Sequence, residues 1–258
     1  MLDICVAGAT GWTGSAVLQG VLEADDLGLR SAVARSAAGD EVAGARVFDR
    51  VGEALDGVDV LIDYTSHLVV KENVLTAIEG GVAVVVGTSG LSADDYADID
   101  AAARSRGVGV VAAGNFSLTA AMAQAAALLV ARHLPHWEVI DFASATKPDA
   151  PSGTARELAE RLAEVRRPVL DRPLDETDGP REARGTTVGG AQVHSVRLPS
   201  FVVSTEVLFG LPDERLSIRH DAGGSPTPYV AGTLLAARLA PERVGLTRGL
   251  DSLLLESG

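Results

Sequence analysis

The sequence lacks most of the features that would take it outside the ordinary globular class. Cys5 is the only cysteine, so no internal disulfide is available, and its place in an apolar run predicts a small packed hydrophobic side chain. No apolar run approaches the roughly 18 residues of a membrane-spanning helix, and there is neither an internal repeat nor a low-complexity tract. We therefore expect a soluble protein whose 258 residues bury a core without disulfides or a metal site.

Positive charge is also scarce. The chain has 22 Lys and Arg residues against 35 Asp and Glu, for a formal net charge of −13. Nucleic acids and anionic membranes attract a cationic surplus, so we predict neither as a partner, and an anionic ligand would need a local basic pocket. The first residues enter an apolar strand-like run without the basic segment and cleavage site of a secretory signal, and we expect a cytoplasmic protein.

The first part of the chain alternates apolar runs with helical patterns. Five runs are expected strands: 4–8, 29–34, 58–64, 82–87 and 108–113. Apolar strands separated by helices are typical of a parallel sheet covered on both faces. We predict an α/β fold with a Rossmann-like, doubly wound sheet and a dinucleotide-binding domain over residues 1–116.

A second, smaller α+β domain is predicted over residues 117–221, for substrate binding and oligomerisation. Its expected helices are an Ala-rich stretch at 118–133 and a helix ending at Val165, and its expected strands are 137–143, 193–198, 202–209 and 216–220. These strands indicate an open mixed sheet, mostly antiparallel. Residues 166–190 are rich in Pro, Gly, Asp and Arg and are predicted to form a long lid-like loop. A further helix is expected at 229–239.

A glycine motif follows the first expected strand. Its spacing is G-x-x-G-x-x-G, and it opens a helix at Ser15. Glycines in a strand-to-helix turn let the backbone approach a pyrophosphate, which then lies at the helix N-terminus. The predicted cofactor-binding residues of this turn are Gly8, Thr10, Gly11, Trp12, Thr13 and Gly14; the alternative is an ordinary tight turn.

The end of the second expected strand bears on the choice of cofactor. Sites selective for NAD have an acidic residue there, whereas this chain has Arg35 and Ser36. A guanidinium and a hydroxyl suit the 2′-phosphate of NADP, so we predict NADPH as cofactor, with NADH as the alternative. Arg35 as a solvated surface charge is the competing interpretation.

The segment from Lys147 to Ala155 combines a cation with a Ser-Gly-Thr turn that opens a helix. The ammonium, the N–H groups at the helix N-terminus and the Thr hydroxyl all favour a bound carboxylate or phosphate. We predict that Lys147, Ser152, Gly153 and Thr154 bind an anionic small molecule. The alternative for Lys147 is a solvated lysine.

This segment, KPDAPSGTA, resembles the substrate-binding signature KxDAPSGTA of the dihydrodipicolinate reductase family, and the resemblance covers essentially the whole chain. It implies a nicotinamide-dependent reductase acting on a cyclic unsaturated imine dicarboxylate, in the lysine and diaminopimelate pathway. It also implies that residues 222–258 complete the first domain, and that the second domain's sheet forms a homotetramer. Three more segments resemble cofactor-contacting loops, whose predicted residues are Tyr64, Thr65, Gly87, Thr88, Ser89, Gly114, Asn115 and Phe116. For residues 63–66 a helix N-cap explains the pattern equally well.

Two departures from the family pattern concern catalysis. The family has adjacent histidines before the signature, where this chain has Ala143 and Ser144, and residues 223–228 lack the family's arginine. Loss of a positioned general acid costs roughly 10² to 10⁴ in rate, which leaves Lys147 as the predicted catalytic residue. The leading hypothesis is therefore a reductase of a different small carboxylated imine. The alternatives are an authentic 4-hydroxy-tetrahydrodipicolinate reductase and a non-catalytic NADPH-binding protein.

Overall fold

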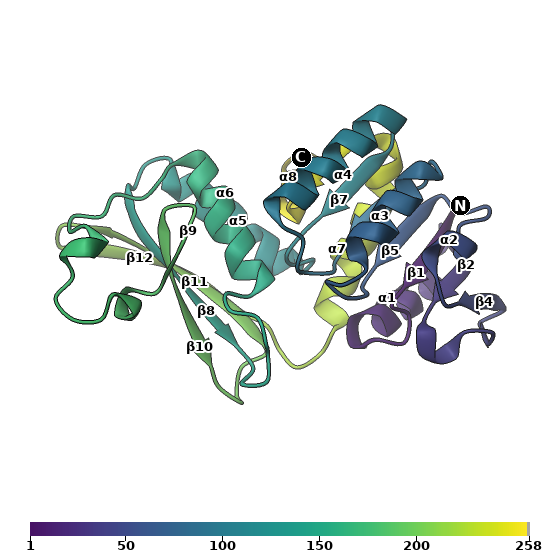
Figure 1. The fold of residues 1–258 in the computed structure, drawn as a ribbon, viewed down its shortest axis with the longest axis horizontal. Helices are drawn as coiled ribbons and strands as arrows, with labels where there is room; N and C mark the ends of the chain where they lie inside the picture. Colours follow the sequence, from purple (N-terminus) through teal and green to yellow (C-terminus); the bar gives the residue numbers. More distant parts are fainter. Residues whose placement is uncertain (257–258) are drawn as a thin grey trace. The chain divides into compact units, whose positions relative to one another are not determined.

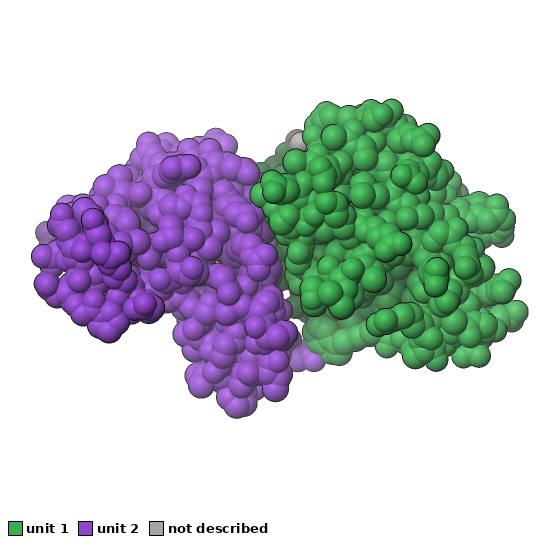
Figure 2. Space-filling model, in the orientation of Figure 1, with its two compact units in different colours: residues 1–118, 225–258 green, residues 119–224 purple. Residues whose placement is uncertain are grey.

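The computed structural model describes residues 1–256 and divides the chain into two compact units, which Figure 2 colours separately. Unit 1 comprises residues 1–118 and 225–258, and unit 2 comprises residues 119–224. Unit 2 is thus one continuous stretch of chain inserted into unit 1. Each unit is described by itself below.

Unit 1 is built on an eight-stranded sheet with the order β13-β7-β6-β5-β1-β2-β4-β3, in which every pair is parallel except β3 with β4. Its strands are β1 (Leu2–Ala7), β2 (Leu27–Val33), β3 (Glu41–Val42), β4 (Ala45–Phe48), β5 (Val60–Asp63), β6 (Ala83–Val86), β7 (Gly109–Ala112) and β13 (Gly245–Arg248). All residues of β5, β6 and β7 are buried, as expected for strands covered on both faces. The predicted Rossmann-like sheet is confirmed.

Helices pack along both faces of this sheet (Figure 1). They are α1 (Trp12–Glu23), α2 (Val51–Ala54), α3 (Val70–Glu79), α4 (Ala93–Arg106), α7 (Thr227–Leu239) and α8 (Leu250–Glu256). α1 packs against α7, whereas α2, α3 and α4 pack in succession and share a core with Leu61, Val84 and Val110. Cys5 lies in the same core, as predicted, and burial raises the pKa of its thiol to about 12.

Unit 2 holds a five-stranded mixed sheet with the order β12-β11-β8-β10-β9. Its strands are β8 (His136–Ala143), β9 (Thr186–Val188), β10 (Ala191–Arg197), β11 (Val203–Leu211) and β12 (Glu214–Asp221). β8 and β10 are parallel, and the other pairs are antiparallel. The helices α5 (Leu118–Ala131) and α6 (Gly153–Val165) form a core with the buried face of β8, which includes Trp137 and Val139.

Several elements differ from the sequence-based expectation. The long lid-like loop predicted over residues 166–190 contains the strand β9 and short 3-10 helices at 174–176 and 181–184, so its expected bounds are wrong in part. The strands β3, β4 and β13 were not predicted; each has four residues or fewer and includes a charged residue, whereas the equally short β6 and β7 lie in continuous apolar runs. Among residues 1–256 no helix combines the length and apolar character needed to cross a bilayer, and no three metal-ligating side chains gather in one place.

A close backbone contact of α7 yields a test of unit 1. A Cβ on Gly232 would lie 2.0 Å from the carbonyl oxygen of Phe116, so we expect Gly232→Ala to lower the free energy of unfolding by about 1–3 kcal/mol through overpacking. Gly52→Ala is the matched control. Its Cβ would meet only Thr76 Cγ2 at 3.6 Å, and we expect no loss of stability. Urea unfolding measures both, and equal stabilities would contradict the close packing.

Candidate functional site

The carboxyl ends of four neighbouring strands in unit 1 line up at one edge of the sheet. Ala7 pairs with Asp63, Asp63 with Val86, and Val86 with Ala112. The next residue of each strand extends the ladder: Tyr64 N donates to Ala7 O at 2.9 Å and Gly87 N to Asp63 O at 2.9 Å. In open α/β sheets, ligands bind outside this edge. The loops predicted to contact a cofactor therefore begin side by side.

The glycine turn between β1 and α1 has the geometry that a pyrophosphate requires. Gly8 has φ 82°, and a Cβ there would lie 2.2 Å from Tyr64 O. A Cβ on Gly14 would lie 2.1 Å from Gly8 O. Gly11 is the N-cap of α1, where no side chain caps the helix and the first turn contains no acid. The N-terminus of α1 thus favours an anion, and the turn fits a dinucleotide.

Arg35 and Ser36 begin a short 3-10 helix directly after β2, beside the glycine turn. Ser36 Oγ lies 3.4 Å from Thr10 Oγ1, which joins the two segments, and Arg35 is exposed. An exposed guanidinium at this edge can pair with an anion.

Aromatic side chains border the same edge. Trp12 opens α1, is 51% exposed, and packs edge-on against Tyr229 with ring centroids 6.0 Å apart. Tyr64 donates its hydroxyl to Thr233 Oγ1 at 2.7 Å, since Thr233 donates its own to the Tyr229 carbonyl. Burial raises the pKa of Tyr64, so its phenol stays neutral. A Cβ on Gly87 would lie 2.2 Å from the Tyr64 ring, so this glycine makes room for the tyrosine.

Asp63 holds the loops after β5 and β6 together. It is fully buried. Its Oδ1 accepts from Thr65 N at 3.0 Å, Thr65 Oγ1 at 2.7 Å and Thr88 Oγ1 at 2.6 Å, and its Oδ2 accepts from Asn73 Nδ2 at 2.8 Å. The hydroxyls of Thr65 and Thr88 are therefore committed to Asp63, which fixes the path of both loops.

The remaining predicted cofactor residues follow β6 and β7. Ser89 is exposed beside Thr88. After β7, Asn115 Oδ1 accepts from Ser117 N at 2.8 Å, which shapes the turn from Gly114 into α5, and Phe116 is 2% exposed with its ring edge-on to Tyr64 at 6.3 Å. The predicted cofactor residues thus lie in segments that follow β1, β2, β5, β6 and β7 at one edge of the sheet, including the first turn of α1.

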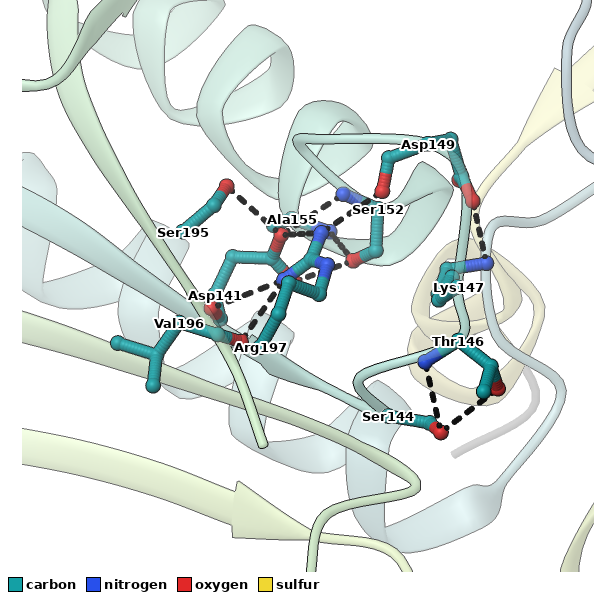
Figure 3. Close-up of polar contacts among 10 residues, drawn as sticks. All are labelled: Asp141, Ser144, Thr146, Lys147, Asp149, Ser152, Ala155, Ser195, Val196 and Arg197. Carbon is teal, nitrogen blue, oxygen red and sulfur yellow. Dashed lines mark hydrogen bonds and ion pairs between the residues drawn. The ribbon is translucent and has the colours of Figure 1, made fainter. Parts of the chain in front are cut away.

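The predicted substrate residues lie in unit 2, where β8 leads into α6 (Figure 3). Lys147 Nζ lies 2.8 Å from Asp149 Oδ1, and the Lys147 side chain is one-quarter exposed. Ala143, at one histidine position of the family, is fully buried. Ser144 Oγ lies 3.1 Å from Thr146 Oγ1 and 3.4 Å from Thr146 N. This stretch therefore offers hydroxyls and an ammonium for binding and proton transfer.

Ser152, predicted to bind the substrate, is 1% exposed and bonds to groups within unit 2. It is the N-cap of α6, its Oγ accepts from Ala155 N at 3.3 Å, and Gly153 and Thr154 form the first residues of the helix. Ser152 N and Oγ both donate to Asp141, at 2.9 and 2.7 Å. Asp141 in turn meets Arg197 Nη2 at 2.8 Å.

Neither Asp141 nor Arg197 was predicted as a site residue. The available signal was the acid itself: Asp141 shares the helix-covered face of β8 with Trp137 and Val139 and is fully buried. An acid in an apolar alternating pattern is rarely buried without a partner. Its partner Arg197 lies 56 residues further along the chain, and no pattern in the sequence distinguishes it from the other arginines.

The Asp63 network generates a test of the cofactor edge. We expect Asp63→Ala to lower the free energy of unfolding by about 3 kcal/mol, because several partly buried donors lose their acceptor, and to weaken NADPH binding because the Thr65 and Thr88 loops are released. Urea unfolding and fluorescence titration with NADPH measure the two effects. The control is Asp59→Ala, which removes one exposed acceptor for Asp3 N, and we expect little effect on either quantity. Unchanged NADPH affinity in Asp63→Ala would contradict the positioning role.

Comparisons with known proteins agree with this geometry. The family model "Dihydrodipicolinate reductase, N-terminus" matches residues 2–116, and "Dihydrodipicolinate reductase, C-terminus" matches residues 114–254. A protein of Streptococcus pneumoniae (strain P1031) named 4-hydroxy-tetrahydrodipicolinate reductase is 35% identical over 254 residues, which cover 98% of this chain and 99% of the relative.

Solved structures give the same picture. A dipicolinate-bound dihydrodipicolinate reductase from Paenisporosarcina sp. TG-14 matches with a TM-score of 0.78 and 25% identity, over 98% of this chain and 99% of that one. GenD2 from gentamicin A biosynthesis, in complex with NAD, shares the fold with a TM-score of 0.66 and 17% identity, over 98% and 90% of the two chains. The chain belongs to the dihydrodipicolinate reductase family and is a nicotinamide-dependent oxidoreductase.

Proposed function

We propose that this chain is a 4-hydroxy-tetrahydrodipicolinate reductase of lysine and diaminopimelate biosynthesis. The observation that carries the proposal is the similarity to a reductase of that name over 98% of this chain, together with the retained Lys147-to-Thr154 turn. Similarity to a dipicolinate-bound structure supports a cyclic dicarboxylate as ligand. The comparisons thus favour this hypothesis over the altered-substrate hypothesis that the missing histidines suggested.

We propose that unit 1 is the dinucleotide-binding domain and that its cofactor is NADPH. The glycine turn would hold the pyrophosphate, Arg35 and Ser36 the adenosine 2′-phosphate, and the loops fixed by Asp63 the nicotinamide end. When bound, this cofactor supplies a hydride. The chain's own contribution is to hold it at a fixed edge of the sheet, with Tyr64 kept neutral and packed against Gly87.

We propose that unit 2 binds the substrate. The N-terminus of α6 at Gly153 and Thr154 would receive one carboxylate, and the Lys147 ammonium would pair with the anion in place of Asp149. Lys147 is also the proposed proton donor. Ala143 and Ser144 stand where the family has histidines, and the Lys147 ammonium is the cationic N–H group in this stretch. Ser152 would contribute indirectly: it caps the N-terminus of α6 and fixes that terminus through its hydrogen bonds to Asp141.

A reductase of a different carboxylated imine is the second candidate. The observation that favours it is the fully buried Ala143 beside Ser144 and Thr146, whose hydroxyls contact each other, in a stretch without imidazole.

We further propose that the sheet face of unit 2 opposite α5 and α6 forms a homotetramer interface. Phe142 and Phe201 pack 4.9 Å apart on that face, and the Arg219 guanidinium lies 4.8 Å above the Phe142 ring.

The proposed function is tested by NADPH oxidation with freshly generated 4-hydroxy-tetrahydrodipicolinate. We expect turnover by the native chain and a loss of about 10² to 10⁴ in kcat/KM in Lys147→Ala, the range for a removed general acid. Lys71→Ala is the matched control, since Lys71 is the other lysine and is held by Asp95 and Asp98 at 2.7 Å. It should keep the native rate.

The other possible outcomes would each support a different function for this chain. Turnover of another carboxylated imine, but not of this substrate, would establish the second candidate. Tight NADPH binding without oxidation by any imine would leave a non-catalytic nucleotide-binding protein.

The cofactor preference has its own test. We expect Arg35→Ala to weaken NADPH binding by about 10-fold, since a hydrogen bond to a charged group contributes about 1.5–3 kcal/mol, and to leave NADH binding unchanged. Arg30→Ala is the control, because Arg30 Nε donates to Asp56 O at 3.1 Å, in the turn before β5. Equal losses for NADPH and NADH would show that Arg35 does not recognise the 2′-phosphate.

A further inference from the structure

Asp141 is a fully buried carboxylate that accepts four hydrogen bonds from side chains and backbone of other residues. Its Oδ2 accepts from Ser152 N at 2.9 Å, Ser195 Oγ at 3.1 Å and Arg197 Nη2 at 2.8 Å, and its Oδ1 accepts from Ser152 Oγ at 2.7 Å. A carboxylate withdrawn from water requires such donors. Two of the four come from Ser152, the residue that starts α6.

Arg197 connects the same carboxylate to the chain before α6. Its Nη2 donates to Asp149 O at 2.8 Å as well as to Asp141, and its side chain is 18% exposed. Asp149 also forms the 2.8 Å ion pair with Lys147. Figure 3 shows Arg197 between Asp141 and the Asp149 backbone, with Lys147 on the far side of Asp149. One guanidinium therefore reaches both the buried acid and the turn that holds the lysine.

The turn from Asp149 to Ser152 is thus fixed at both ends by the Arg197–Asp141 pair. The pair comes from β10 and β8, which are adjacent strands of the sheet and form a rigid support. The elements that bind the anion, Lys147 and the N-terminus of α6, are connected to the sheet through this turn. The guanidinium uses two nitrogens here: Nη2 donates to Asp141 Oδ2 and Asp149 O, and Nη1 donates to the backbone carbonyls of Asp141 at 3.4 Å and Val196 at 3.0 Å. A lysine has one nitrogen and cannot reproduce this planar set of bonds.

We propose that the Arg197–Asp141 pair is a positioning device for anion binding, which sets the separation of Lys147 from the α6 N-terminus. The inference deepens the proposed function and rests on it for the identity of the anion. Asp141 and Arg197 are positioning residues in this proposal; they act through Ser152 and Asp149. The competing explanation is a buried ion pair that only stabilises unit 2.

The discriminating variant is Arg197→Lys. An ammonium can still pair with Asp141, so the charge balance of the buried site is kept, but it loses the Nη1 bonds to Asp141 O and Val196 O that fix the guanidinium plane, and we expect a looser hold on Asp149 O. We expect thermal unfolding near that of the native chain, dipicolinate binding weakened about 10-fold to 100-fold by misplacement of the binding groups, and unchanged NADPH binding. KM should rise by more than kcat falls.

Arg238→Lys is the matched control. Arg238 also pairs with a carboxylate, through Nε and Nη2 at 2.7 and 2.8 Å to Asp26, but it lies in unit 1. We expect its dipicolinate affinity to equal that of the native chain. Unchanged dipicolinate affinity in Arg197→Lys would overturn the proposal, and so would a loss that accompanies destabilisation of all of unit 2.

A second variant covers the case in which Arg197→Lys fails to fold. Asp141→Leu combined with Arg197→Met replaces the pair by apolar side chains, an exchange that often preserves stability. The positioning role predicts a folded double variant with weakened dipicolinate binding. Native affinity in that folded variant would overturn it.

Hydrogen exchange separates this proposal from the proposed function. We expect faster amide exchange over residues 149–156 in Arg197→Lys and native exchange over residues 158–165, the rest of α6. This readout needs no ligand. If the native chain fails to bind dipicolinate, the proposed function is in error, while the exchange of residues 149–156 still decides whether Arg197 positions the turn.

Discussion

The removal of two carboxylates from water, Asp63 in unit 1 and Asp141 in unit 2, is the constraint on which the predicted cofactor loops of unit 1 and the predicted anion-binding turn of unit 2 depend. A buried carboxylate needs donors from the protein. In each unit those donors belong to the loops that carry the predicted binding residues: Thr65 and Thr88 for Asp63, and Ser152 for Asp141. The loops are therefore fixed by their hydrogen bonds to the two carboxylates. Asp63 is itself fixed in β5, and Asp141 in β8.

The two acids solve the same problem with different donors. Asp63 receives hydroxyl, amide and backbone groups, which arrange three segments around a site for a large cofactor. Asp141 receives a guanidinium in addition, and that guanidinium reaches beyond it to the Asp149 carbonyl. The second arrangement couples the turn proposed to bind an anion to two strands of a sheet. A small dicarboxylate, which has few atoms to contact, gains most from such fixed binding groups.

The sequence predicted those parts of the fold that have a local pattern. The five main strands of unit 1 appear as apolar runs, and the glycine turn and the start of α6 have short-range signatures. The four residues of β13 have no such pattern, since their place beside β7 is fixed by tertiary packing. The partners of Asp63 and Asp141 could not be found either, because a hydrogen bond between Asp141 and Arg197 depends on the parallel pairing of β8 with β10.

The insertion of unit 2 into unit 1 has a consequence for biosynthesis. Residues 119–224 are continuous, so all of unit 2 is synthesised before α7 and β13. Unit 1, although it begins first, stays without its last sheet strand and without the helix that packs on α1 until more than four-fifths of the chain exists. The usual order, in which the N-terminal domain folds first during synthesis, is thereby reversed. A ribosome stalled after Gly224 would carry a complete unit 2 and an unfinished unit 1.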